Sequence, residues 1–271
     1  MACLGIFVVL ASGDILSKTV HMEKAGDIRY HFDDHVALTP AKHILMIGVG
    51  TAMNVEHYDS LSLQIIKINP SIAVFLMDPN PGWPVKLSAT DFARLVETTI
   101  KELPTLLPSY TDAQIIIGGH SAGGKSAIGA LSNLSFTPAG YFGLDPFPVG
   151  NSTKNAIHVP VILWGFSQTT CGVLTSFAAK ATYGIGNTSH RVLYQIQNTA
   201  PPALTHCSFT DKGCFGFLCP CSKNDGIIRD LVGKSVNLFV TALLEGTFEK
   251  EKLELEASSI SVKMFVNADN M

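Results

Sequence analysis

The chain has 271 residues, of which 46% are hydrophobic and 15% charged, and its formal net charge is −3 at pH 7. This length and composition suit one large buried core, and the lack of a dense Lys/Arg cluster argues against nucleic acid or an acidic membrane as a partner. No apolar stretch reaches the roughly 20 residues that span a bilayer, so we expect a soluble protein without a transmembrane segment.

The first thirteen residues have the pattern of a secretory signal peptide. The apolar run Leu4 to Ala11 leads into Ala11-Ser12-Gly13, small residues at the spacing that a signal peptidase accepts. No Lys or Arg precedes the run, so a strand buried in the core is the alternative interpretation. We expect a signal peptide at 1–13 and a protein that is secreted or in the endomembrane lumen, with a cytoplasmic location as the alternative.

Two short strands are predicted next, followed by apolar runs that alternate with helical segments. Ile15–His21 and Ile28–Phe32 flank a short polar turn, a spacing suited to an antiparallel hairpin. The later strands are predicted at His43–Ile47, Ile72–Met77, Gln114–Gly118, Gly140–Leu144, Val159–Phe166 and Arg191–Gln197. Helices are predicted over Ser88–Leu107 and Ile227–Leu244. The pattern predicts an α/β fold with a mostly parallel eight-stranded sheet, an N-terminal antiparallel hairpin and helices on both faces.

The domain organisation that follows is simple. We expect one domain over residues 14–244, which carries the motifs described below, and a charged C-terminal extension over residues 245–271. The extension carries alternating charges over 249–254 and then an apolar segment over 261–266, so we expect a solvated helical extension with room for one added edge strand.

Five of the six cysteines lie in the second half of the chain. The clustered set comprises Cys171, Cys207, Cys214, Cys219 and Cys221. Zinc is one interpretation, but paired Cys-x-x-Cys knuckles are missing, so we favour disulfides in an exported protein and expect no metal site. Cleavage after Gly13 would also remove Cys3, and the disulfide pairing stays open.

The octapeptide Gly119-His120-Ser121-Ala122-Gly123-Gly124-Lys125-Ser126 satisfies two unrelated motifs. As Gly-x-Ser-x-Gly it is a nucleophile elbow that displays Ser121 on a strained strand-to-helix turn. As Gly-x-x-x-x-Gly-Lys-Ser it is a phosphate-binding loop in which Lys125 and Ser126 reach a nucleotide and its magnesium. Both interpretations predict a strand, a tight turn and a helix, so other residues must decide between them.

A serine nucleophile needs a base and a carboxylate that orients the base, both at the carboxyl ends of the parallel strands. His158 and His190 precede predicted strands and lie at the opposite edge, whereas His206 follows a strand and precedes the last helix. His206 is therefore the predicted base.

The acid is predicted by elimination. The chain has no Asp or Glu between Asp145 and Asp211. Asp145 ends the strand that follows the nucleophile, and Asp211, five residues past His206, is the fallback. The order Ser121, Asp145, His206 is the order that a nucleophile-elbow architecture uses, which favours the serine interpretation.

An oxyanion hole is predicted from two backbone N–H groups. One is that of Ala122, directly after the nucleophile. The other comes from the loop after the third strand, where Val49 is our choice and Gly50 the next candidate.

Three segments carry a resemblance to a known family. They are Gly119-His120-Ser121-Ala122-Gly123-Gly124, Gly143-Leu144-Asp145-Pro146 and His206-Cys207-Ser208-Phe209. Together they resemble the α/β-hydrolase superfamily, and more narrowly its lipase and chlorophyllase-like branches, over about residues 15–244. The resemblance implies an α/β-hydrolase fold with Ser121 as nucleophile, Asp145 as acid, His206 as base, and Val49 and Ala122 as oxyanion donors. Chlorophyllases usually carry Arg where this chain has Ala122.

The predicted function is hydrolysis of a small-molecule carboxylic ester, apolar or aromatic, through an acyl-enzyme and without a cofactor. The predicted substrate-binding residues are Gly50, Trp83, Phe147, Phe166 and Phe209. The alternatives are a nucleotide-binding protein that uses the phosphate loop, a thioesterase or peptidase, and a non-catalytic binding protein on the same scaffold. No obligate protein partner is expected.

Overall fold

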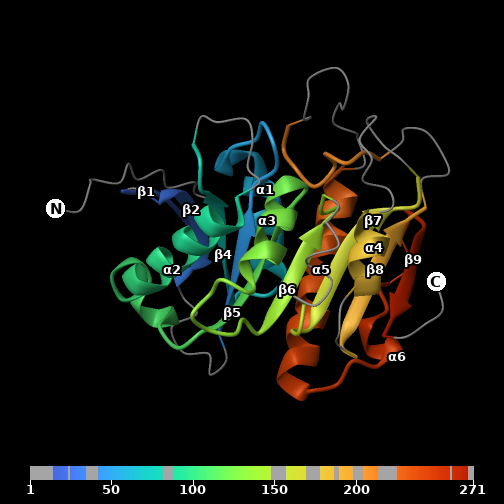
Figure 1. Ribbon diagram of the computed structural model, residues 1–271. Helices are drawn as coiled ribbons and strands as arrows, with labels where there is room; N and C mark the ends of the chain where they lie inside the picture. The colour runs from blue at the N-terminus through green and yellow to red at the C-terminus, as the bar shows by residue number, and fades with distance from the viewer. Residues whose placement is uncertain are drawn as a thin grey trace.

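The computed structural model describes residues 15–23, 25–34, 42–81, 88–147, 157–168, 178–185, 189–197, 204–212, 225–256 and 258–267. These residues form an α/β structure around one nine-stranded sheet in the order β1-β2-β4-β3-β5-β6-β7-β8-β9 (Figure 1). Strands β3 to β8 run parallel to one another, whereas β2 pairs antiparallel with both β1 and β4, and β9 pairs antiparallel with β8. The expected signal peptide at 1–13 lies outside the described residues.

The strands follow the apolar runs of the sequence closely. They are β1 (Ile15–Met22), β2 (Gly26–Asp33), β3 (His43–Gly48), β4 (Ile72–Asp78), β5 (Gln114–His120), β6 (Gly140–Leu144), β7 (Val161–Phe166), β8 (Arg191–Ile196) and β9 (Val262–Val266). Every residue of β3, β4, β6 and β7 is buried, as expected for strands that are covered on both faces.

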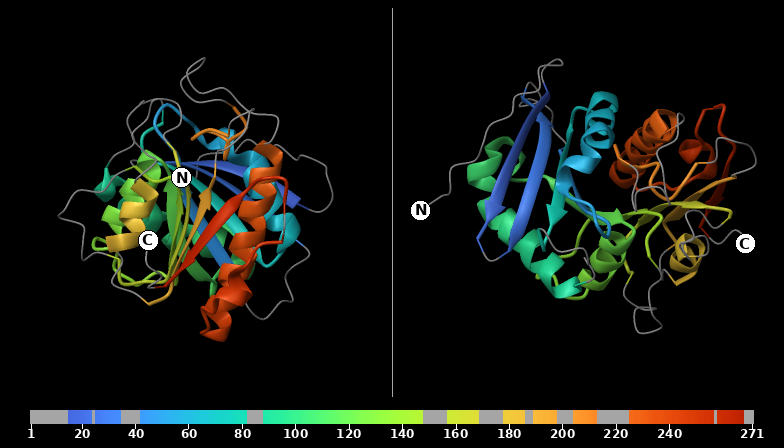
Figure 2. Two further views of the ribbon diagram at one scale, coloured as in Figure 1. Left: turned by 90° about the vertical axis from the view of Figure 1, so that its right-hand side faces the viewer. Right: turned by 90° about the horizontal axis from the view of Figure 1, so that it is seen from above.

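Helices cover both faces of the sheet. They are α1 (Asp59–Ile68), α2 (Ala89–Leu106), α3 (Ala122–Ala130), α4 (Ala178–Ile185), α5 (Asp225–Glu245) and α6 (Lys250–Leu253), with short 3₁₀ turns η2 (Val55–Tyr58) and η3 (Pro108–Tyr110). Helices α1, α5 and α6 share one hydrophobic core with one face, and α2, α3 and α4 share a second core with the other face (Figure 2). Each fully buried aliphatic or Phe side chain in these cores contributes about 1.5–3 kcal/mol. No helix in the described part of the chain is both long enough and apolar enough to cross a bilayer.

The limits of α2 show how local sequence sets the ends of a helix. The Ser88 side chain accepts a hydrogen bond from the Asp91 N–H at 3.1 Å, which satisfies one of the free donors at the start of the helix. Pro104 lies in the last turn, and the helix ends two residues later at Leu106. The predicted boundaries, Ser88–Leu107, differ by one residue at each end.

The sheet has one strand more than the eight predicted, and the added strand is the edge strand for which the C-terminal extension had room. The ninth strand, β9, belongs to the segment that we assigned to a charged extension, and it pairs along the whole of Val192–Ile196. Phe265 and Val266 enter the two cores, while Lys263 is exposed. The extension is therefore part of the domain, and the expected eight-stranded sheet is wrong by this edge strand.

A partly buried ion pair connects the β1–β2 pair to helix α1. The Arg29 guanidinium donates to both carboxylate oxygens of Asp59, at 2.6 and 2.7 Å, and His31 Nε2 lies 3.1 Å from the same carboxylate. Ser17 and Thr19 on β1 complete the network through His31 and Arg29. Burial alone would raise the pKa of Asp59, but the hydrogen bonds and charges of His31 and Arg29 lower it below its ordinary value.

The Asp59→Asn substitution is expected to destabilise the protein by about 3 kcal/mol at pH 7, because it leaves the Arg29 charge buried without its partner. A lowered folded-state pKa contributes stability above the unfolded-state value of about 3.9 and loses it as pH falls through the folded-state pKa. The difference between wild type and variant should therefore shrink below about pH 4 in urea denaturation. Asp91→Asn, which breaks an exposed pair with Arg94, is the control and should cost under about 0.5 kcal/mol. A difference for Asp59→Asn that stays constant down to pH 3 would contradict this account.

Candidate active site

Ser121 is the single residue between β5 and α3, and its backbone is strained. Its φ of 54° and ψ of −120° lie in a region that residues other than glycine rarely enter. The Ser121 N–H donates to the Leu144 carbonyl at 3.1 Å, and the Ser121 carbonyl accepts from the Phe147 N–H at 2.9 Å. These bonds to the segment after β6 hold the strained turn in place at the carboxyl edge of the sheet.

Close backbone packing explains the glycines of the motif. A Cβ on Gly119 would lie 2.5 Å from the Gly123 carbonyl carbon, and a Cβ on Gly123 would lie 2.2 Å from the Gly48 carbonyl oxygen. Any side chain at either position would push α3 away from the end of β3. The turn around Ser121 therefore requires glycine on both sides.

The same geometry bears on the phosphate-loop interpretation. Gly119 and His120 belong to β5, and Lys125 and Ser126 lie inside α3. A phosphate cradle needs several consecutive loop residues whose N–H groups converge on the anion. Here one residue separates strand from helix.

Asp145 lies level with Ser121 on the neighbouring strand. The register pairs His120 with Leu144, so the next residue of each strand, Ser121 and Asp145, leaves the sheet side by side. Asp145 also has a positive φ, 39°, and its N–H donates to the Trp164 carbonyl at 2.7 Å. Its side chain is fully buried.

His206 brings its ring to this carboxylate. His206 Nδ1 lies 2.6 Å from Asp145 Oδ2, and both side chains are buried. Because the carboxylate accepts, Nδ1 carries the proton and Nε2 is the basic nitrogen. Asp211, the fallback acid, instead accepts a hydrogen bond from the Ser60 N–H at 2.9 Å and lies 3.8 Å from Arg229.

The third contact of the predicted triad is not formed. In the described part of the chain, no hydrogen bond joins Ser121 Oγ to the His206 ring. Ser121 is 6% exposed, so little of the residue is open to solvent. The structure thus brings Ser121, Asp145 and His206 to one sheet edge and joins two of them directly.

The predicted oxyanion donors have different environments. The Val49 N–H donates to the Met77 carbonyl at 3.1 Å, and the Gly50 N–H donates to the Tyr58 hydroxyl at 2.9 Å. Both N–H groups already donate to other acceptors. The prediction of Val49 as a free oxyanion donor is therefore wrong, and the Gly50 N–H, the next candidate, is not free either. The Ala122 N–H, at the first position of α3, has no hydrogen-bond partner among the described residues.

The predicted substrate-binding aromatic residues also differ from one another in burial. Phe166 and Phe209 are buried and contact each other at 5.8 Å between ring centroids, and Phe209 also meets the His120 ring edge-on. Phe209 belongs to the His206 segment and packs it against Phe166 and His120, which corrects the assignment of both phenylalanines as substrate walls. Phe147 is half-buried beside Ser121, with Lys125 Nζ 5.6 Å from its ring centroid. Trp83 lies outside the described residues.

Two residues at this edge have roles that the sequence analysis did not assign. His120 Nδ1 lies 2.8 Å from the Tyr58 hydroxyl, and His120 Nε2 lies 2.9 Å from the His206 carbonyl oxygen. Burial and the nearby His206 hold the pKa of His120 well below its ordinary value, so the ring is neutral at neutral pH. Tyr58 is also fully buried, and burial raises its pKa. In the sequence motif His120 is only the neighbour of Ser121, and no sequence pattern predicts its hydrogen bond to Tyr58.

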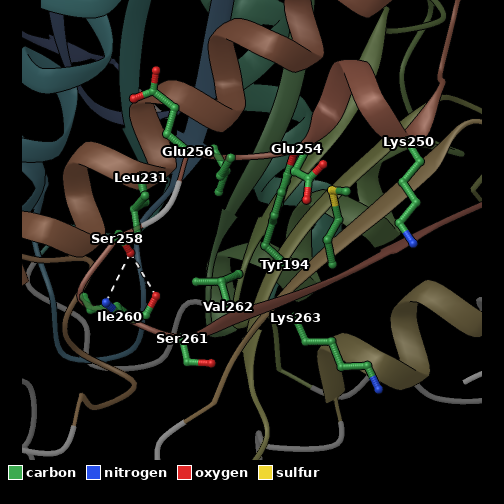
Figure 3. A pocket seen from close by; sticks show the side chains of 12 residues that line it. Tyr194, Leu231, Lys250, Glu254, Glu256, Ser258, Ile260, Ser261, Val262 and Lys263 are labelled. Carbon is green, nitrogen blue, oxygen red and sulfur yellow. Dashed lines mark hydrogen bonds between the residues drawn. The ribbon is translucent and has the colours of Figure 1, made fainter.

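A cavity of about 500 Å³ lies away from these residues, between α5, the segment around α6, strand β8 and the edge strand β9 (Figure 3). Its lining includes Tyr194, Leu231, Lys250, Val262 and Met264, and none of the predicted catalytic residues. Charged and hydroxyl side chains such as Lys250, Glu254 and Ser258 also line this cavity, but among the described residues no serine, histidine and carboxylate are joined there, so we place the candidate active site at the sheet edge.

Cys207, the one cysteine among the described residues, is buried next to His206 and disulfide-bonded. The other cysteines lie outside the described part, and within that part no group of three His, Cys, Asp or Glu side chains could hold a metal ion. No protein-family model matches the chain, and no curated protein matches it. The assignment of a function therefore depends on the geometry of the site.

Proposed function

We propose that this protein is a serine hydrolase that cleaves carboxylic esters through Ser121, His206 and Asp145 on an α/β-hydrolase fold. One observation carries the proposal. The buried hydrogen bond of 2.6 Å between His206 Nδ1 and Asp145 Oδ2 lies beside a serine held at a φ of 54°. An imidazole oriented by a carboxylate is the base that a serine hydroxyl needs near neutral pH.

In the first half of the reaction, Ser121 Oγ attacks the ester carbonyl while His206 Nε2 takes the hydroxyl proton. The same proton then passes to the leaving alcohol as the bond from the carbonyl carbon to the leaving oxygen breaks, and an acyl-enzyme remains. Proton transfer requires Ser121 and His206 to approach to hydrogen-bond distance, and this contact is often long in a site without substrate. A change in the Ser121 side-chain torsion moves the hydroxyl without moving the pinned backbone.

The negative charge that develops on the carbonyl oxygen needs backbone donors. The Ala122 N–H is one, because it directly follows the nucleophile and begins a helix. For the second we assign Thr51, the next residue of the same loop after the committed Val49 and Gly50. A Cβ on Gly50 would lie 3.4 Å from Ser121 Cβ, so this loop is in contact with the nucleophile.

In the second half, water attacks the acyl-enzyme with His206 again as base, and the carboxylic acid leaves from Ser121 Oγ. These steps need neither a metal nor an organic cofactor. Phe147, whose backbone is hydrogen-bonded to that of Ser121, carries a half-buried aromatic ring, which favours an apolar or aromatic ester. Thioesters are cleaved by the same nucleophilic chemistry, so substrate tests should include them.

The nucleotide-binding alternative receives less support from the same residues. The strand-to-helix connection at Ser121 provides one residue where a phosphate loop needs several, and Lys125 Nζ lies over the Phe147 ring. The nucleotide alternative also gives Ser121 and His206 no role.

A fluorophosphonate probe is expected to label the wild-type protein at Ser121, because the probe reacts with activated serines. Peptide mapping by mass spectrometry locates the labelled residue. Heat-denatured protein is the control and should stay unlabelled, since activation depends on the folded site. Label on a different serine, or none on the folded protein, would remove Ser121 as the nucleophile.

A further inference from the structure

A chain of three hydrogen bonds crosses the sheet edge beneath the candidate site. The Gly50 N–H lies 2.9 Å from the Tyr58 hydroxyl, the hydroxyl lies 2.8 Å from His120 Nδ1, and His120 Nε2 lies 2.9 Å from the His206 carbonyl oxygen. All of these groups are buried. The chain connects the loop after β3 to the backbone of His206.

The two ends fix the direction of every bond in this chain. A backbone N–H can only donate and a backbone carbonyl can only accept. His120 Nε2 must therefore carry the proton that it donates to the His206 carbonyl. In a neutral ring Nδ1 then accepts from Tyr58, whose oxygen accepts from Gly50. The Tyr58 hydroxyl also lies 3.2 Å from Met53 Sδ, but a thioether sulfur is a weaker acceptor than the His120 nitrogen, so the single hydroxyl proton goes to Nδ1 and every group in the chain has a partner.

The segment that carries His206 depends on such anchors, because residues 204–212 contain neither helix nor strand. At the far end of the segment, the Asp211 N–H donates to the His57 carbonyl at 2.7 Å, and the Asp211 carboxylate accepts from the Ser60 N–H. At His206 itself, the backbone is held by His120, whose ring also lies 4.5 Å from the His206 ring. The Asp145 bond fixes one edge of the imidazole, and His120 fixes the backbone from which the imidazole projects.

We infer that His120 is a positioning residue, which acts with Tyr58 to set the distance between the loop after β3 and the His206 backbone on either side of Ser121. The inference rests on the proposed hydrolase function. It adds that the loop after β3, which carries the proposed oxyanion donor, and His206, the proposed base, are aligned by this one buried chain of hydrogen bonds. His120 does not touch the substrate.

The test measures kcat and KM for a p-nitrophenyl ester with variants of His120. His120→Leu keeps the approximate volume and removes both hydrogen bonds, and we expect kcat to fall about 10²-fold with KM changed less than about 2-fold, as for a misplacement of about 1 Å. His120→Gln can donate to the His206 carbonyl again and accept from Tyr58, so its kcat should return to within about 5-fold of wild type.

Tyr58→Phe is the second variant, because it removes only one hydroxyl and keeps the packing of the ring. It should lower kcat about 10-fold, since Gly50 and His120 both lose their partner. His43→Leu is the matched control. His43 is a fully buried histidine at the start of β3, far from the carboxyl edge, so this change should lower the melting temperature and leave kcat unchanged.

The outcomes separate the two proposals. Wild-type kcat in His120→Leu or Tyr58→Phe, or a His120→Gln variant as slow as His120→Leu at equal melting temperature, overturns the positioning role while Ser121 labelling remains. A wild-type protein that neither turns over esters nor labels at Ser121 overturns the proposed function, and the positioning role with it.

Discussion

The Ser121→Ala variant is expected to lose ester hydrolysis by a factor on the order of 10⁶ in kcat, the scale measured when a serine hydrolase loses its nucleophile. No other group in the described site could form the acyl-enzyme in its place. The residual rate should come from substrate binding and the oxyanion donors alone. Initial rates with a p-nitrophenyl ester, at enzyme concentrations high enough to detect slow turnover, measure this loss.

Folding of the variant needs a separate check, because Ser121 has a strained backbone. Alanine at a φ of 54° has a strain similar to that of serine, so the melting temperature should change by only a few degrees. Ser132→Ala, an exposed serine just beyond the other end of α3, is the matched control and should keep full activity. Activity retained by Ser121→Ala would exclude the acyl-enzyme on this residue.

Asp145→Asn is expected to lower kcat by about 10⁴-fold while the fold is preserved. An Asn amide would face His206 Nδ1 with its NH₂ group, which favours the tautomer that carries its proton on Nε2. That nitrogen then cannot accept the proton of Ser121. Asn also tolerates the positive φ of Asp145 better than most residues do. Steady-state kinetics and a melting curve on the same preparation separate loss of rate from loss of structure.

Asp211→Asn is the matched control for this carboxylate. It lies on the same segment as His206 but accepts from the Ser60 N–H and does not contact the imidazole. We expect a lower melting temperature and a kcat within a few-fold of wild type, through slight movement of the segment. If Asp211→Asn is the inactive variant and Asp145→Asn is active, the assignment of the acid is reversed.

Much of the sheet could be predicted because its parallel strands are buried on both faces. Runs such as Ile72–Met77 and Gly140–Leu144 are continuously apolar, and the structure matches them within one residue at each end. Strand β9 gave a weaker signal, because Lys263 is exposed and only Phe265 and Val266 are buried. Edge strands have one unpaired side and mix polar with apolar residues. The alternating charges therefore led us to assign this segment to a solvated extension.

The candidate site was predictable where chain order and elimination decide, and not where individual hydrogen bonds decide. His206 and Asp145 were chosen by strand end and by the lack of other carboxylates, and the structure joins them. The Val49 N–H is taken by Met77 through the strand register, which no local motif reveals. Phe209 follows the base in the sequence, but only the course of its segment shows that its ring is buried against Phe166.

The late arrival of β9 has a consequence for how this protein is made. Until β9 is synthesised, the outer side of β8 is a row of unsatisfied N–H and C=O groups, open to strands of other nascent chains. Helices α5 and α6 must be translated in between, so this side of β8 stays unpaired until both helices have been made. During this interval, pairing of β8 with a strand of another molecule competes with its native pairing with β9. This side of the sheet is therefore one that a chaperone would need to shield.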